Sequence, residues 1–329
     1  MALPTGTISM SQVNVELGRP ANASINLNDA QVRQLAGIPS GAVSMNNLRG
    51  KSAFTNATGG SITNISVSGV PYRVHTFTGP GTFSVSQAGS LFPGVEYLVI
   101  GGGGGGGGDT HAGGGGAGGY RTSVPGQISG GGAAAEPLAA ISPNTNYSVS
   151  IGAGGPGRGA SSNLRGVNGG NSVFGSITSL GGGGGGTAID VRPVGPQIGG
   201  NGGSGGGGGR ENGGGGAGTA GQGRNGGPGR RSPWNGGGGG GAANAGQAGV
   251  GSPNKGGDGG AGRSSNITGT AITRAGGGGG ATFNGSQGAG GAGGGSPGAS
   301  GSGAANTGSG GGGQRPGGSG IVIVRYRTG

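Results

Sequence analysis

The side chains that most often perform catalysis are scarce in this sequence. Cysteine is absent, histidine occurs twice, and aspartate and glutamate together occur eight times in 329 residues. His111 stands in the sequence Asp109-Thr110-His111 between two glycine runs, and His75 lies in a β-type segment, where we expect it on the solvent face. The spacing shows no Ser/His/Asp arrangement and no carboxylate pair suited to glycan cleavage.

Metal and cofactor motifs are missing as well. Without cysteine there is no thiolate metal site and no disulfide. Matches to Gly-x-Gly-x-x-Gly are numerous because glycine is everywhere, but none stands in a βαβ unit, so they do not indicate a dinucleotide site. The sequence therefore predicts a protein that is not an enzyme and that holds no metal and no cofactor.

Binding chemistry is concentrated in short polar segments between the glycine runs. The segment RRSPWN holds the only tryptophan, Trp234, together with Arg230, Arg231 and Asn235. An exposed aromatic ring beside two guanidinium groups suits a sugar that carries an anionic group. Trp234 could equally cover a glycine face at the end of the array. The other candidates for a binding surface are Asp109, His111, Arg210, Phe283 and Asn284.

Residues 1–52 contain few glycines and differ from the rest of the chain. Short apolar-periodic stretches with Ser, Asn and Gly at their ends predict brief helices. The module is too small to carry a separate activity, so we expect it to dock the chain onto another protein. The candidate docking side chains are Val13, Val15, Leu17, Val32, Leu35 and Leu48.

Residues 53–100 change to a period of two. Alternating and β-branched segments separated by Gly-Pro or Gly-Ser turns predict strands. Further strands are expected near 147–151, 172–180 and 321–326, and several of these segments run directly into glycine. We expect them to form a β-rich platform with 53–100.

Glycine accounts for 104 residues and recurs in runs from 101 to 320. Ordering each one costs on the order of 1–2 kcal/mol in backbone entropy, so either the runs are flexible spacers or something offsets that cost. Extended helices with three residues per turn make no internal hydrogen bonds and can bond to one another if no side chain separates them. The expected fold is therefore mainly β and irregular, with a bundle of polyglycine type II helices joined by polar loops.

Several segments resemble a known family. MSQVNVELG and SINLNDAQVRQLAG are similar to a module that opens many bacteriophage tail and tail-fibre proteins. VEYLVIGGGGGG and the closing GSGIVIVRY resemble the glycine-rich domain common in phage tail proteins. The chain also resembles the tip adhesins of T-even-like phages, whose polyglycine helix bundles contact the host receptor through distal loops. It departs from those adhesins in residues 1–52 and in its β-rich region.

This resemblance implies a virion component of the tail or tail fibre. Its partners would be other tail or fibre proteins through residues 1–52 and a host surface glycan or outer-membrane protein through the loops, with no nucleic acid. One alternative is a structural tail connector without receptor contact. Another is a glycine-rich nucleic-acid binder, favoured by the net charge of +11 alone. We expect no signal peptide and no membrane insertion. The sequence leaves open whether the chain forms a homo-oligomer.

Overall fold

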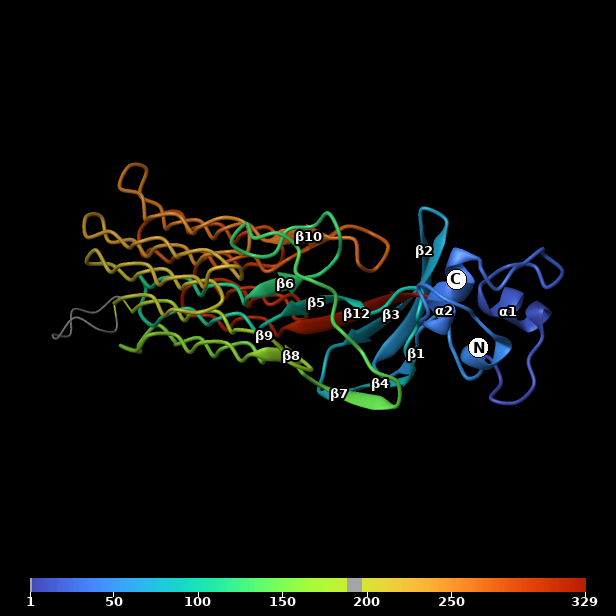
Figure 1. Ribbon diagram of the computed structural model, residues 1–329. Helices are drawn as coiled ribbons and strands as arrows, with labels where there is room; N and C mark the ends of the chain where they lie inside the picture. The colour runs from blue at the N-terminus through green and yellow to red at the C-terminus, as the bar shows by residue number, and fades with distance from the viewer. Residues whose placement is uncertain (1, 188–196) are drawn as a thin grey trace.

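The computed structural model describes residues 2–187 and 197–329. The molecule is elongated (Figure 1). The helical segment and both chain ends lie at one end, strands occupy the middle, and extended glycine runs form the other end. The described residues contain more strand than helix, so the expectation of a mainly β protein is confirmed.

Short helices make up the N-terminal module, residues 2–52. They are α1 (Met10–Glu16), α2 (Ala30–Ala36) and α3 (Met45–Leu48). A capping box between Ser9 and Gln12 begins α1. Gly37 ends α2 in the left-handed conformation, with φ at 73°. Because each helix is so short, its stability depends on packing against the others.

The candidate docking residues divide into two groups. Val13, Leu17, Val32, Leu35 and Leu48 are buried with Leu3 in the core of the module, which Leu91 of the β-rich region completes. Only Val15 of the six is exposed, at 61% of its surface. The five buried side chains therefore hold the module together, and of this set Val15 alone is free to contact a partner.

The strands form two sheets and a hairpin. One sheet has the order β1 (Asn56–Thr58), β4 (Gly81–Gln87), β7 (Thr145–Ser150), β8 (Ser172–Phe174), β9 (Ile177–Ser179). The other has the order β2 (Ser61–Val67), β3 (Val70–Phe77), β12 (Ile321–Arg327), β5 (Glu96–Ile100), β6 (Tyr120–Thr122). The hairpin pairs β10 (Arg263–Ser265) with β11 (Ile272–Arg274).

The segment 172–180, which we expected to be one strand, is instead the hairpin of β8 and β9. Gly175 lies in its turn with φ at 56°. This left-handed conformation is the one that glycine adopts without strain, and it reverses the chain. Residues with a preference for strands, such as Val173, Phe174 and Ile177, lie on both sides of this glycine, which is why the sequence reads as a single strand.

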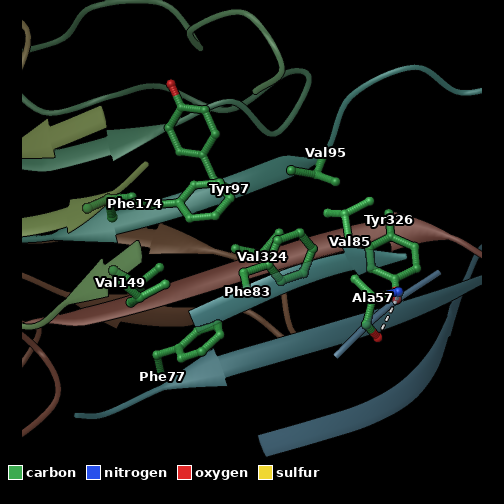
Figure 2. Close-up of a cluster of buried hydrophobic side chains, with 12 residues drawn as sticks. Ala57, Phe77, Phe83, Val85, Val95, Tyr97, Val149, Phe174, Val324 and Tyr326 are labelled. Atoms are coloured by element: carbon green, nitrogen blue, oxygen red, sulfur yellow. Dashed lines mark hydrogen bonds between the residues drawn. The ribbon is translucent and has the colours of Figure 1, made fainter. Parts of the chain in front are cut away.

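The two sheets pack face to face around an aromatic core (Figure 2). Phe83 and Phe174 come from the first sheet and Phe77, Tyr97 and Tyr326 from the second. The Phe83 ring lies edge-on to Phe174, with 5.7 Å between centroids. The opposite face of the second sheet is also covered, by a cluster that includes Val74, Tyr120 and Ile267. The second sheet is therefore buried on both faces where it joins the glycine runs.

The expectation that His75 faces solvent is wrong. Its side chain is fully buried in the core between the sheets, edge-on to Phe83 at 5.1 Å. Its Nδ1 lies 2.7 Å from the Gly59 carbonyl oxygen and its Nε2 lies 3.2 Å from the Tyr326 hydroxyl. Because β3 is covered on both faces, alternation along the strand does not identify a solvent side.

The glycine runs form a hydrogen-bonded array. In the run 101–108, every third amide donates to the same neighbouring segment, over N···O distances of 2.8–3.1 Å. The accepting segments are 113–119, 164–170 and 315–318, and all run antiparallel to it. Its carbonyl oxygens accept from 155–158, 182–185 and 311–314, which run parallel to it. These described segments surround the run, so its backbone groups are satisfied without a sheet.

Contact between neighbouring backbones explains why these positions are glycine. A Cβ atom on Gly103 would lie 1.9 Å from the Ser309 carbonyl oxygen, and one on Gly104 would lie 2.2 Å from that of Gly183. Alanine enters where a run reaches the sheets: Ala117 and Ala242 are buried in the apolar cluster there. The array thus begins as a continuation of the apolar core and extends beyond it on backbone hydrogen bonds.

Candidate binding site

The loops at the end of the array away from the sheets form what we call the distal end. The run 101–108 leaves the sheet directly after β5, so the loop that follows it, 109–112, lies at this end. The loops 209–213, 230–235, 250–255 and 281–287 join other runs there (Figure 1). A backbone bridge closes 230–235 between Arg230 and Asn235, and a second bridge ties Asn235 to Thr282. The hydrogen bonds of the array and these two bridges hold the loops in place relative to one another.

Aromatic side chains from separate loops meet at the distal end. The His111 ring is edge-on to Trp234, with 5.9 Å between centroids, and 6.1 Å from the ring of Phe283. The Arg210 guanidinium carbon lies 4.8 Å from the Trp234 ring centroid. Trp234 remains 51% exposed and Phe283 65% exposed. These side chains pack against one another, and the exposed faces of Trp234 and Phe283 remain accessible to a ligand.

A cavity of about 440 Å³ opens among these rings. This volume falls in the range of small-molecule sites. Its walls are both apolar and polar. The lining residues are His111, Arg231, Ser232, Pro233, Trp234, Asn254, Thr282, Phe283 and Asn284.

Charged groups at the rim are partly paired. Arg231 Nε lies 3.1 Å from a carboxylate oxygen of Glu211, although the arginine side chain stays 73% exposed. His111 Nδ1 lies 3.5 Å from Asp109 Oδ1. Burial, with a smaller effect of Arg210, lowers the pKa of His111, and Asp109 opposes this shift. The imidazole is therefore neutral at physiological pH and contributes to the cavity as a ring with a hydrogen-bonding edge.

The structure brings most of the predicted binding residues together. His111, Arg231, Trp234, Phe283 and Asn284 line the cavity. Arg210 and Asp109 support its rings, as described above. The remaining candidates are Arg230 and Asn235. Arg230 is exposed and its Nε donates to the Ser232 carbonyl at 3.0 Å. Asn235 is buried, and its side chain donates to the Val250 carbonyl at 2.6 Å, so it is structural.

Asn254 and Thr282 are lining residues that the sequence analysis missed. A signal for Asn254 is present in the sequence, because SPNK at 252–255 repeats the Ser-Pro pattern of SPWN at 232–235. Both segments end in a residue that closes its loop by a backbone bridge, Asn235 to Arg230 and Lys255 to Val250. The repeat therefore identifies two loops of the same kind. Thr282 has no comparable signal.

Across residues 2–187 and 197–329, no group of three or more His, Asp or Glu side chains could hold a metal ion. No helix in this part of the chain is long and apolar enough to span a bilayer.

Comparison with known proteins gives a family. No curated protein matches the sequence. A family described as a glycine-rich domain matches residues 76–327, which include the sheet strands from the end of β3 to β12 and the whole glycine array. The chain belongs to this glycine-rich domain family.

Proposed function

We propose that the chain is a receptor-binding protein at the tip of a bacteriophage tail or tail fibre. The observation that carries this proposal is the cavity at the distal end, where His111, Trp234 and Phe283 come together from three separate loops. Exposed apolar side chains that gather into one patch with a polar rim mark interaction sites. The ligand is a host surface glycan or a loop of an outer-membrane protein.

The scaffold in this proposal is a bundle of polyglycine type II helices. Such a helix has three residues per turn, and in the run 101–108 the partner of each amide repeats every third residue. Eight residues at the rise of this helix span about 25 Å. The bundle carries the loops away from the sheets and holds them rigid, so little conformational entropy is lost when they bind.

The N-terminal module attaches the chain to other tail or fibre proteins. It lies at the opposite end of the molecule from the distal loops (Figure 1). Val15 is an exposed apolar side chain on α1 and is suited to such a contact. Attachment in several copies per virion would add avidity to individually weak sites. The proposed location is the virion, without contact to nucleic acid and without insertion into a membrane.

Binding of labelled full-length protein to a panel of Gram-negative bacteria tests the proposal. The double variant Trp234→Ala/Arg231→Ala removes a cavity ring and a rim charge. Tryptophan and arginine are enriched among the hot-spot residues of interfaces, whose truncation costs about 2 kcal/mol or more, so we expect at least about a 30-fold loss of binding to a susceptible strain.

The matched control is the double variant Leu164→Ala/Arg165→Ala. Both residues are exposed in another loop of the array and lie outside the cavity. We expect this protein to bind as the wild type does, with both variants melting within a few degrees of it. If the two variants bind equally well, the receptor surface lies elsewhere. If folded wild type binds no strain, the structural connector becomes the better account.

A further inference from the structure

A second cluster of polar groups lies at the junction of the glycine array and the sheets, far from the distal loops. In the β10–β11 hairpin, Arg263 stands directly opposite Arg274. Tyr120, the first residue of β6, is fully buried in the apolar cluster at this junction, together with Ile267 from the hairpin loop. Two cationic side chains are therefore placed against the apolar core.

Arg274 is the unusual member of this cluster. Only 7% of its surface is exposed, and its Nη1 is buried without a hydrogen-bond partner. Among the ion pairs of the described residues, none includes Arg274, Arg263 or Arg224. An isolated guanidinium ion out of water costs several kcal/mol unless an opposite charge compensates it.

Arg263 adds a second buried donor without an acceptor. Arg263 Nε is buried and has no hydrogen-bond partner, and the buried Tyr120 hydroxyl meets no group other than the Ser265 hydroxyl among the described residues. The Ser265 hydroxyl lies beside the Tyr120 hydroxyl, and its oxygen accepts from the Ile267 amide at 3.2 Å, which leaves its own proton to donate. Arg274 Nη1 and Arg263 Nε therefore lack an acceptor among the described residues, and the neutral hydroxyl oxygens of Tyr120 and Ser265 carry no charge that could balance the two cations.

Tyr120 does not supply the missing negative charge. Burial raises its pKa to about 12, and the hydrogen bond with Ser265 and the nearby charges of Arg274 and Arg263 only partly offset this effect. The phenol is therefore neutral and acts as a donor at physiological pH. A third cation lies close by: a methyl group on Gly132 would be 2.8 Å from Arg224 Nη2 and 3.9 Å from Arg263 Nη2. Arg224 is exposed, so this side of the cluster is open to solvent.

We propose that a small inorganic anion, chloride or an oxyanion such as phosphate, binds between Arg274, Arg263 and Tyr120. Such an ion accepts from the unpartnered guanidinium groups and from the Tyr120 and Ser265 hydroxyls, and it neutralises the buried charge. The ion links the hairpin to β6 and so stabilises the junction between the glycine array and the sheets. This inference is independent of the proposed receptor function.

Thermal unfolding of the full chain in defined anions tests this site. Sodium gluconate keeps the ionic strength constant while chloride or phosphate is titrated in separate arms. An anion at about five times its dissociation constant shifts the folding equilibrium roughly sixfold, which raises Tm by about 1.5 °C in a chain of this size. The arm that produces a saturable rise identifies the anion.

The variant Arg274→Met removes the buried charge and retains an apolar side chain of similar length. We expect it to lose the saturable rise. Arg49→Met, at an exposed arginine of the N-terminal module, serves as the matched control and should keep it. If wild type and Arg274→Met respond equally to both anions, the effect is general salt stabilisation, and the proposal is wrong.

A direct measurement covers the case in which Arg274→Met does not fold. Wild-type crystals grown in bromide should give an anomalous peak within hydrogen-bonding distance of Arg274 Nη1 if the site takes a halide, and crystals grown in phosphate should give tetrahedral density there if it takes an oxyanion. Ordered water in both crystals would overturn the proposal.

Discussion

His75 illustrates how a single polar side chain becomes part of an apolar core. Its two ring nitrogens face the Gly59 carbonyl and the Tyr326 hydroxyl. Since a carbonyl only accepts, Nδ1 carries the proton and Nε2 is left to accept from the tyrosine. Burial lowers the pKa of His75 and raises that of Tyr326. Both groups are therefore neutral in the native state and satisfy one another without a buried charge.

This arrangement predicts a loss of stability in mild acid. Below pH 6.5, the ordinary pKa of histidine, the unfolded chain takes up a proton at His75 and the native chain does not. The free energy of unfolding should therefore decrease as the pH falls from about 7 towards 5. Urea denaturation at a series of pH values measures this slope.

The pKa of His111 is also lowered, so the variant His111→Gln measures how much of the pH dependence comes from the distal end. Because His75 is fully buried and His111 keeps part of its surface exposed, we expect His75→Gln to lose more of the wild-type slope than His111→Gln does. Equal slopes in wild type and His75→Gln between pH 7 and pH 5 would contradict the burial of a neutral His75.

The types of the binding residues could be predicted from the sequence, but their contacts could not. Trp234, Phe283 and His111 were recognisable as aromatic residues in polar segments between glycine runs. They meet because the glycine array brings three segments that are far apart in the sequence to its distal end. This arrangement depends on the order in which the runs pack. Asn235 is an example: its sequence neighbours indicate an exposed loop residue, but it is buried and its backbone forms a bridge with Thr282.

At the scale of elements, the glycine runs replace side-chain packing with backbone contact. Neighbouring runs approach so closely that a Cβ atom has no space at most inward positions. The composition predicted extended runs that bond to one another, and the repeating hydrogen-bond partners of 101–108 agree with this interpretation. The direction and order of the runs had no signal in the sequence, because one glycine run does not differ from another in composition.

The array therefore predicts opposite effects for alanine at two glycine positions. Gly104→Ala would place a Cβ atom 2.2 Å from the Gly183 carbonyl oxygen, whereas Gly214→Ala would meet no atom within 4 Å. We expect Gly104→Ala to cost about 3 kcal/mol or more, since backbone must move to relieve the overlap. Gly214→Ala should be neutral or stabilising by up to about 1 kcal/mol.

Chemical denaturation of the two variants beside wild type measures this difference. Each variant adds the same methyl group, so the comparison isolates the position. A loss of stability in Gly104→Ala no larger than in Gly214→Ala would mean that the runs do not pack as described.

At the scale of the whole molecule, the chain closes on itself. The C-terminal strand β12 lies between β3 and β5, strands formed more than 200 residues earlier in the chain. Its Arg325 Nε donates to a Glu96 carboxylate oxygen at 2.8 Å and is almost fully buried. The glycine array is thus a long insertion between neighbouring strands of one sheet, and both of its ends are anchored in the same core. The apolar character of IVIVRY predicted a strand but not its central position.

This closure explains how a chain with 29% hydrophobic residues folds. Apolar side chains are gathered in the N-terminal module and on the two faces of the second sheet. Backbone hydrogen bonds between the glycine runs then hold the chain in a defined structure from these cores to the distal loops. The proposed receptor site depends on this extension, because flexible glycine runs would not hold Trp234, Phe283 and His111 around one cavity.

Hydrogen–deuterium exchange of the run 101–108 tests this central claim most directly. All eight amides donate to neighbouring segments at 2.8–3.1 Å, so we expect them to exchange orders of magnitude more slowly than an unstructured glycine peptide, and to approach the protection of core strand β5. Exchange of these amides at the unstructured rate, while β5 stays protected, would show that the runs are flexible spacers and would remove the rigid scaffold on which the binding site rests.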